Sequence, residues 1–416
     1  MSRIEELIKE KCPNGVDFYS IGEVCTVVRG ASPRPIKNFI TEDVDGVNWI
    51  KIGDVAVGSK YITSCAERIT REGARKSRYV KKGDFILSNS MSFGRPYILE
   101  IDGCIHDGWL AISDFEDKMI ADYLYYILTS GNIQREMEHR ASFGGAVQNL
   151  NADIVRAIEI PVPPIEVQQE IVRILDKFIE LEAELRAELD VRKKQYEYYR
   201  DNLMDIDDKY PMVKLEDLCT LITKQTGFDY SNSIKPTLVT EAGEERYSFI
   251  QNKDFEGNRI NFDTDYYVPI EVAKRFPKII LDTPSLLISL SGKVGNIGYY
   301  DLPQCAFIGG AVGICKLKND VYGKYIMHYL MSYHGRKYLF QSVKAASHIN
   351  LTVESVRNAL IPIPPIEVQR SISEMLDKFA TLCHHEKNGL PAEITFRKKQ
   401  YEYYRDKLLT FERKVV

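Results

Sequence analysis

The segment IPVPPIEVQ at residues 160–168 recurs as IPIPPIEVQ at residues 361–369, with a single Val-to-Ile change and an offset of 201 residues. A second segment, RKKQYEYYRD at residues 192–201, recurs without change at residues 397–406. Solenoid repeats are about 20–50 residues long, so a period of this size is that of a domain. The sequence therefore predicts a duplicated module, in which a variable block is followed each time by a repeated segment.

The repeated segments carry a helical pattern. Pro163-Pro164 lies just ahead of the first one, where a fixed φ and a missing N–H suit the first turn of a helix. We expect one continuous helix over residues 165–203, about 60 Å long at 1.5 Å per residue. Its apolar positions step by four and three residues in turn, as in a coiled-coil seam; they are Val167, Ile171, Ile174, Phe178, Leu181 and Leu185.

The second copy keeps this spacing at Val368, Ile372, Met375, Phe379 and Leu382. Further along, Gly389-Leu390-Pro391 predicts a break or kink, because proline removes a helical hydrogen bond. Two such helices most simply pack as an antiparallel pair, which relates the halves of the chain by a pseudo-two-fold axis. The alternative is that each helix packs on its own block as ordinary core. The residues expected to pair the helices or to bind a partner are Ile171, Phe178, Leu185, Tyr196, Tyr199, Ile372, Phe379, Tyr401 and Tyr404.

The variable blocks have the pattern of a mixed α/β fold. Short apolar runs at 85–87 and 286–288 follow turn residues and predict strands, and each leads into a loop rich in Ser and Gly. The stretches 120–128 and 322–330 predict core helices rather than aromatic binding platforms. The predicted fold class is therefore α+β, with two α/β blocks joined by long helices. Its predicted divisions are block 1–160, helix 161–210, block 211–361 and helix 362–416.

A basic segment lies in the first block. Between Lys60 and Lys82 eight bases face two acids, a local charge of +6. Arg, Lys and small hydroxyl side chains supply most protein contacts to nucleic-acid phosphates, although a solvated basic surface is the alternative. The candidate phosphate-binding residues are Arg68, Arg71, Arg75, Lys76 and Arg78.

The Ser- and Gly-containing loops are candidate base readers. Residues 88–95 and 289–296 keep Ser and Gly in matching places, but Arg95 is replaced by Asn296. Arg pairs with guanine edges and Asn with adenine edges, so duplicated loops with different polar ends suit two different half-sites, whereas loop drift after duplication is the alternative. The candidate DNA-binding residues outside the basic segment are Ser90, Ser92, Arg95, Gln148, Lys253, Ser291, Lys293, Asn296 and His348.

Composition limits the other possibilities. The chain has 416 residues, a formal charge of −4 and 44% apolar residues, which suits a water-soluble protein of two or three domains. It has no apolar stretch of 18 residues, and acids interrupt its first helical pattern, so we expect neither a membrane span nor a signal peptide and place the chain in the cytoplasm. Its eight Cys form no C-x-x-C pair, which favours reduced thiols over disulfides or a metal site.

Motifs for catalysis are missing from the sequence. The only Pro-Pro pairs lie in the repeated segments, without the Asn/Asp-Pro-Pro-aromatic motif of an amino-methyltransferase. Ser291-Gly292-Lys293 lacks the remainder of a phosphate-binding loop, and no G-x-G-x-x-G turn occurs. The sequence therefore predicts no catalytic residue, no metal ligand and no cofactor in this chain.

Taken together, these features resemble the specificity subunit of Type I restriction-modification systems. The resemblance covers the whole chain and rests on the two repeated segments, the opening IKEKCPNGV at 8–16 and WIKIGD at 49–54. It implies two target-recognition domains in tandem, which read the two halves of a bipartite DNA site in the major groove, and antiparallel helices that set their spacing. It also implies two modification subunits that methylate adenine with S-adenosylmethionine, and restriction subunits that cleave DNA with ATP and Mg²⁺, in host defence.

Two other classes of function stay open from the residues alone. One is a stand-alone DNA-modifying enzyme, against which the missing motifs count. The other is a scaffold that binds no DNA and works through its coiled-coil helices. The target bases and the gap between half-sites do not follow from the sequence, because the side chains of a loop do not fix which base edges they meet.

Overall fold

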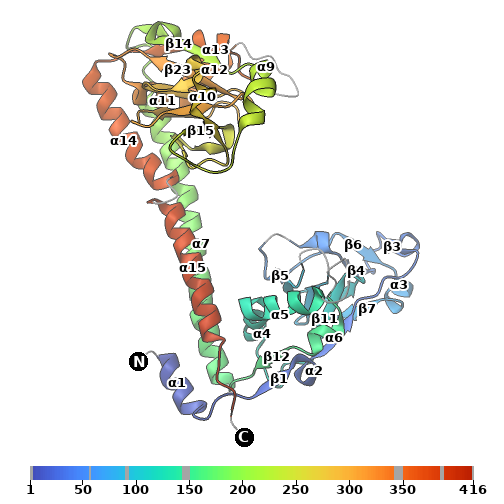
Figure 1. Ribbon diagram of the computed structural model, residues 1–416. Helices are drawn as coiled ribbons and strands as arrows, with labels where there is room; N and C mark the ends of the chain where they lie inside the picture. Colours follow the sequence, from blue (N-terminus) through green and yellow to red (C-terminus); the bar gives the residue numbers. More distant parts are fainter. Residues whose placement is uncertain are drawn as a thin grey trace. The chain divides into compact units, whose positions relative to one another are not determined.

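The computed structural model describes residues 3–55, 58–89, 93–142, 150–341, 350–384 and 388–414. It divides into two compact units (Figure 1), of which the first contains residues 1–183 and 396–416 and the second contains residues 184–395. The first repeated helix begins in the first unit and ends in the second, whereas the last helix ends in the first unit. Each unit therefore contains one variable block, the N-terminal part (the head) of one repeated segment and the C-terminal part (the tail) of the other.

The first repeated helix, α7, runs over Ile165–Leu203, as predicted. Its first turn is closed by the carbonyl of Pro164, which accepts hydrogen bonds from the amides of Val167 and Gln168 at 2.9 and 3.1 Å. The second copy is two helices, α14 (Ile366–His384) and α15 (Leu390–Leu408), which confirms the break predicted at Gly389-Leu390-Pro391. Residues 385–387 lie outside the described part of the chain.

Within each unit the helices pair through aromatic rings. In the second unit, Tyr196 and Tyr199 of α7 meet His384 and Phe379 of α14, with ring centroids 5.8 and 5.5 Å apart. The residue numbers of the contacts rise along α7 and fall along α14, so the two helices are antiparallel. This confirms the predicted antiparallel pairing. In the first unit, Phe178 of α7 stacks on Tyr404 of α15 at 5.5 Å.

The buried face of α14 differs from the predicted seam. Met375 and Leu382 are 46% and 37% exposed, whereas Leu376, Ala380 and Cys383 are buried in the core of the second block. The N-terminal part of α7 also packs on its own block, because Ile171 belongs to the core of the first block. The seam prediction was wrong at Met375 and Leu382, whereas the seam residue Phe379 does stack on Tyr199 of α7. The alternative that this part of the helix packs on its own block holds for the buried face of α14. A spacing of four and three residues describes neighbouring stripes of one helix equally well.

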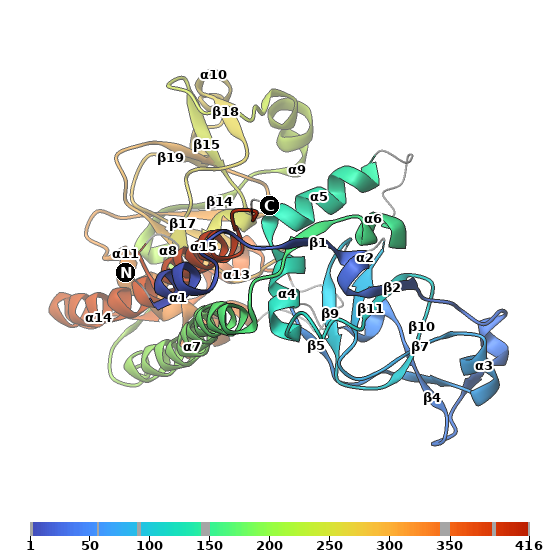
Figure 2. The same cartoon turned by 90° about the horizontal axis from the view of Figure 1, so that it is seen from below.

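The first block has two five-stranded sheets. They have the orders β2-β11-β8-β9-β5 and β3-β6-β4-β10-β7, and β1 pairs with β12 beside them. Figure 2 shows α4 and α5 on one side of this unit and α3 at the far end, near β4 and β7. The elements are α1 (Arg3–Lys11), β1 (Phe18–Ser20), α2 (Ile21–Val24), β2 (Thr26–Arg29), β3 (Ile40–Thr41), β4 (Val47–Ile50), β5 (Tyr61–Ile62), β6 (Glu67–Ile69), α3 (Arg71–Arg75), β7 (Arg78–Val80), β8 (Phe85–Ser88), β9 (Pro96–Leu99), β10 (Gly103–Ile105), β11 (Trp109–Ser113), α4 (Ala121–Thr129), α5 (Gly131–Ser142), α6 (Ala152–Arg156) and β12 (Glu159–Pro161).

The second block repeats this arrangement with two four-stranded sheets, β14-β23-β20-β21 and β18-β15-β22-β19. Strands β13 and β24 pair as β1 and β12 do, and β16 and β17 form a separate hairpin. The elements are β13 (Met212–Lys214), α8 (Leu215–Leu218), β14 (Cys219–Lys224), α9 (Gly227–Asp229), β15 (Arg246–Ile250), β16 (Phe255–Glu256), β17 (Arg259–Ile260), β18 (Tyr267–Pro269), α10 (Ile270–Ala273), β19 (Ile280–Leu281), β20 (Ser285–Ser289), β21 (Ile297–Tyr300), β22 (Ala306–Ile308), β23 (Val312–Leu317), α11 (Gly323–Met331), α12 (Tyr333–Phe340), α13 (Val353–Arg357) and β24 (Leu360–Pro362).

The first sheet of each block is buried on both faces. Successive side chains of a strand point to opposite faces, so Phe85 and Leu87 of β8 pack toward the helices while Ile86 packs toward the second sheet. Leu286 and Leu287 of β20 divide between two cores in the same way. This explains why β8 and β20 read as continuous apolar runs, and it confirms both predicted strands.

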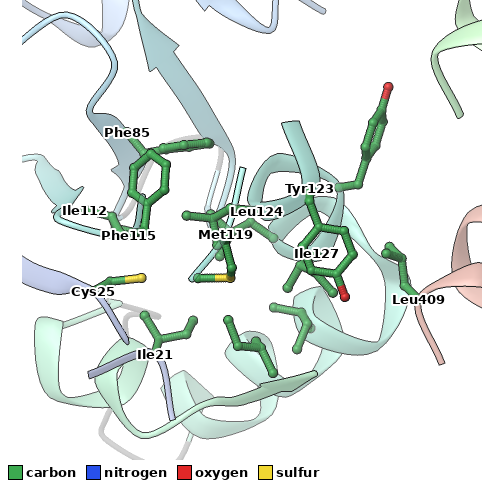
Figure 3. Close-up of a cluster of buried hydrophobic side chains, with 14 of the residues drawn as sticks. Ile21, Cys25, Phe85, Ile112, Phe115, Met119, Tyr123, Leu124, Ile127 and Leu409 are labelled. Atoms are coloured by element: carbon green, nitrogen blue, oxygen red, sulfur yellow. The ribbon is translucent and has the colours of Figure 1, made fainter. Parts of the chain in front are cut away.

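The core of the first unit includes the end of the chain. Figure 3 shows Leu409, which follows α15, beside Tyr123 and Ile127 of α4. Leu409 is 6% exposed, although it lies nearly 300 residues from α4 in the sequence. The C-terminal tail is therefore part of the first block's hydrophobic core.

Candidate nucleic-acid interface

The described residues of the Ser- and Gly-containing loops make the same closing hydrogen bonds in both units, which makes each a hairpin between two strands. The amide of Ser88 donates to the carbonyl of Arg95 at 3.2 Å, and that of Ser289 donates to the carbonyl of Asn296 at 2.9 Å. Inside this closure, Gly94 and Gly295 donate back to Ser88 and Ser289 at 3.0 and 2.9 Å. Arg95 and Asn296 thus occupy the same closing position in two equivalent loops.

The glycines of these hairpins are required by the backbone and by close neighbours. Gly94 has a φ of +67° and Gly295 a φ of +81°, a region that other residues rarely adopt. A Cβ on Gly295 would lie 2.9 Å from the ring of Phe340. Gln134 braces the first loop by donating to the carbonyl of Gly94 at 2.8 Å. The hairpins are therefore held by the helices beside them, and a held loop presents its end residue in one place.

The two hairpin ends differ in exposure. Arg95 is exposed, while Asn296 is half-buried. Ser291 is half-buried, and its carbonyl accepts a hydrogen bond from the Asn252 side chain. Lys293 is exposed at the tip of the second loop. Ser90, Ser92, Gln148 and His348 lie outside the described residues.

The basic segment lies on the second sheet of the first unit and on α3. Arg68 donates to the carbonyl of Val44 at 3.1 Å, and Arg78 donates to that of Arg29 at 3.4 Å. Arg71 and Arg75 are exposed on α3. Lys76 pairs with Glu72 at 2.7 Å and lies 4.7 Å from the centre of the Phe39 ring.

Not every base of this segment is available for a phosphate. Lys60 forms an ion pair with Asp122, and its side chain is 17% exposed among the rings of Tyr125 and Tyr126. In the second unit, Lys253 pairs with Asp265, and hydrogen bonding to that carboxylate raises the pKa of the Lys253 amine. The exposed bases of the basic segment are Arg71, Arg75 and Lys76 on or just after α3, and Arg78, Lys81 and Lys82 beyond it.

A short connection joins the first hairpin to the basic segment. The carbonyl of Asp107 accepts hydrogen bonds from the Asn89 side chain at 2.9 Å and from the Arg29 side chain at 3.1 Å. Arg29 in turn receives the bond from Arg78. Asn89 and Asp107 were not among the residues predicted from the sequence, because the partners are far apart along the chain.

The identical helix tails dock in equivalent ways. The Asp406 carboxylate accepts a hydrogen bond from the amide of Gly131, at the start of α5, at 3.1 Å. The Asp201 carboxylate accepts one from the amide of Tyr333, at the start of α12, at 3.0 Å. Of the other predicted pairing residues, Ile171 and Tyr196 are buried, and Leu185, Ile372 and Tyr401 are half-buried.

A buried histidine joins the second block to its helices. His328 Nε2 lies 2.8 Å from Asp377 of α14, and its Nδ1 lies 3.4 Å from the Tyr196 hydroxyl of α7. Burial lowers the pKa of His328, although Asp377 opposes this. Desolvation raises the pKa of Asp377, but hydrogen bonds from His328 and Lys324 outweigh it and hold that pKa below its usual range. At neutral pH His328 is therefore neutral and donates its Nε2 proton to the Asp377 carboxylate.

This junction predicts an acid-sensitive second unit. Unfolded His takes up a proton near pH 6.5 but folded His328 does so only at lower pH, so stability falls as pH drops below about 6.5, by up to about 1.4 kcal/mol per pH unit. Asp377, whose folded pKa is also lowered, acts in the same direction at lower pH still. We expect His328→Tyr to flatten this dependence in thermal unfolding between pH 7 and 5.

The first unit has a tyrosine at the equivalent place. Tyr123 and Tyr325 make the same hydrogen bond, to the carbonyls of Pro161 and Pro362, so Tyr126 occupies the place of His328. Its hydroxyl donates to Asp176 and has no titration in mild acid. Burial also lowers the pKa of His106 in the first unit and of His384 in the second, so the decisive comparison is between the wild type and His328→Tyr. If hydrogen exchange shows the second unit losing the same protection between pH 7 and 5 in both proteins, the assignment to His328 is wrong.

The described residues contain no group of three or more His, Cys, Asp and Glu side chains that could hold a metal ion. All eight cysteines are free thiols. No helix in the described ranges is both long and apolar enough to cross a bilayer.

Comparison with known proteins gives a consistent result. The family model described as "Type I restriction modification DNA specificity domain" matches twice, at residues 13–191 and 207–395. The chain is 31% identical over 309 residues to the EcoR124I/EcoR124II specificity subunit of Escherichia coli, covering 71% of this chain and 72% of that protein. It is 28% identical to a putative type I restriction enzyme specificity subunit of Haemophilus influenzae, covering 80% of this chain and 84% of that protein.

Solved structures agree in fold. A chain from a type I restriction-modification system matches with a TM-score of 0.63 at 18% identity, covering 95% of this chain and 98% of that one. The HsdS subunit of Thermoanaerobacter tengcongensis matches with a TM-score of 0.50 at 19% identity, covering 96% of both chains. At this level of identity the likeness concerns the fold.

Proposed function

Since the chain belongs to the family of Type I restriction-modification specificity subunits, which recognise DNA sequence, we propose that each of its blocks reads one half of a bipartite site. The observation that carries this proposal is the pair of equivalent hairpins. They share the same closing hydrogen bonds and the same positive-φ glycine, yet one ends in Arg95 and the other in Asn296. Two hairpins with the same backbone but different polar residues at the closing position suit the recognition of different base pairs.

The helices are proposed to set the gap between the half-sites. Two-fold readers commonly contact half-sites about one helical turn apart, roughly 34 Å along the duplex. α7 has 39 residues and is continuous from one unit into the other, so a change in its length changes the path between the two readers. The unbroken helix supports this proposal, because added residues lengthen a continuous helix by a fixed rise per residue.

The repeated helix tails are proposed to bind two modification subunits. Tyr198 and Tyr403 hold the same place in the identical segments and are 65% and 62% exposed. A groove of about 820 Å³ lies beside Tyr403, lined by Lys399, Glu402 and Lys407. Tyr is enriched at protein interfaces, and identical surfaces suit two copies of one partner. Restriction subunits are proposed to join the same complex.

Catalysis is assigned to these partners. We propose that S-adenosylmethionine, ATP and Mg²⁺ act in the modification and restriction subunits and that this chain catalyses no step. Purified chain incubated with labelled S-adenosylmethionine and DNA should transfer no methyl groups until modification subunits are added. Transfer by the chain alone would support the stand-alone enzyme instead.

Arg95→Ala should relax the reading of the first half-site only. A bidentate Arg–guanine contact contributes about 1–3 kcal/mol of discrimination, which is roughly 5- to 150-fold. The measurement is the methylation rate, by the complex with modification subunits, of duplexes changed one base pair at a time. Asn296→Ala is the matched variant, for which the loss should appear in the second half-site. Equal losses at both half-sites for either variant would contradict the two-reader proposal.

A further inference from the structure

A cleft of about 750 Å³ opens in the first unit. Its walls are largely apolar and include Pro33, Ile36, Trp49 and Ile52, and Arg34 and Asp107 lie among its lining residues. None of the residues predicted from the sequence to bind DNA lines it. We propose that Arg34 reads a guanine of the first half-site from this cleft and that Asp107 is its positioning residue. This inference rests on the DNA-reading function proposed above.

Arg34 is exposed and yet held in place. Its side chain is 81% exposed, and its Nη2 donates to Asp107 Oδ2 at 3.2 Å. The other oxygen of that carboxylate accepts from the Ser32 hydroxyl at 2.8 Å. An exposed ion pair of this kind contributes little to stability, so stability does not explain the arrangement. Its effect is to favour one direction of a long side chain.

Asp107 is itself fixed at several points. Besides the Ser32 hydrogen bond, its backbone carbonyl accepts from the side chains of Arg29 and Asn89 at 3.1 and 2.9 Å. The Ser32 hydroxyl is the main cause of a lowered pKa for Asp107, so the carboxylate stays charged at neutral pH. Because Asn89 begins the first hairpin, the cleft and the hairpin share one frame of hydrogen bonds.

The guanidinium keeps donors for a ligand. It has five N–H groups in a planar fork, of which one binds Asp107, and Arg cannot be deprotonated in proteins. Guanine presents two neighbouring acceptors, O6 and N7, in the major groove, and bidentate Arg pairing with them is the commonest specific contact there. The exposed Lys37 in the lining of the cleft suits a backbone phosphate.

The second unit has different groups at the equivalent place. Strand pairing sets Trp109 opposite Ser88 and Val312 opposite Ser289, so Gly310 corresponds to Asp107. The neighbouring polar group there is Gln225, whose side-chain amide is buried and has no hydrogen-bond partner among the described residues. A Cβ on Gly310 would lie 3.5 Å from Gln225 Oε1. Glycine at this position supplies no carboxylate to position an arginine, so the proposed reading by Arg34 concerns the first half-site.

The test uses the full chain in complex with modification subunits. Methylation rates are measured for duplexes in which each base pair of both half-sites is changed in turn, for the wild type and for Arg34→Lys. We expect the wild type to prefer G·C at one position of the first half-site by about 10- to 100-fold, and Arg34→Lys to reduce this preference below about 3-fold. Lys keeps the charge but lacks the rigid planar fork of Arg, so its contact with O6 and N7 is less specific, while overall DNA affinity should change little.

Two further variants separate positioning from folding. Asp107→Asn should weaken the same base preference while leaving the unfolding temperature within a few degrees of the wild type. Lys37→Ala should lower affinity for all duplexes alike without changing base preference, as expected of a phosphate contact. If the wild type discriminates at both half-sites and neither Arg34→Lys nor Arg34→Ala, which removes every donor, changes any preference, the inference about Arg34 is wrong while the two-reader function stands. If the wild type itself shows no base preference, the proposed function fails first.

Discussion

Deleting residues 396–416 should unfold the first block, although the deleted segment follows the second block in the sequence. The tail supplies the buried Leu409 to the first core, with Tyr401, Leu408 and Phe411 packed against it. It also exchanges backbone hydrogen bonds with Val16, at 2.9 Å from Glu412 and 3.0 Å from Lys414. Large apolar side chains contribute about 1.5–3 kcal/mol each, so the loss exceeds roughly 5 kcal/mol, comparable to the whole stability of a domain.

Hydrogen exchange resolves this prediction by region. In the deleted chain the amides of α4, α5 and β1 should lose protection, while those of β20 and β23 in the second unit keep theirs. Tyr403→Ala is the matched control, because Tyr403 lies on the same helix but is 62% exposed and should leave both units unchanged. Unchanged protection of α4 and α5 after the deletion would show that the tail is not part of the first core.

Lengthening the helices should move the recognised half-sites apart. Duplicating residues 184–190 in α7 and 396–402 in α15 adds seven residues to each, about 10 Å at 1.5 Å per residue, or roughly three base pairs. Seven residues nearly preserve the helix face. Methylation of the original site should fall at least about 100-fold, because even one mismatched base pair costs about 1–3 kcal/mol.

The preferred site of the lengthened protein should have a gap about three base pairs longer. The extra base pairs also turn one half-site about the duplex axis, so we expect slower methylation than by the wild type at its own site. Seven residues inserted into the exposed segment 241–245 of the second block are the control and should leave the gap unchanged. A lengthened protein that keeps the original gap would show that the helices do not set it.

Local signals in the sequence predicted much of the fold. The Pro-Pro pair and the spaced apolar residues gave the bounds of α7, and glycine with proline located the break before α15. The continuous apolar runs of β8 and β20 predicted strands, because a sheet covered on both faces has no polar side. Each of these features depends on residues close together in the chain.

Features that depend on distant residues were not predictable. The helix segments 192–201 and 397–406 are identical in sequence. Their residues therefore do not show that 192–201 belongs to the second unit and 397–406 to the first. The buried face of α14 follows from the block it packs on, and Met375 and Leu382 are as apolar as the residues that are buried. Arg34 and Asp107 are 73 residues apart and meet only through the sheet.

The most direct test of two readers joined by helices is a map of methylated adenines. The chain is co-expressed with its modification subunits, and methylation is located on plasmid DNA. Our account predicts one bipartite motif, two short specified blocks around a fixed unspecified gap, and it predicts that Arg95→Ala alters only one block. A single continuous motif, or methylation independent of this chain, would contradict it.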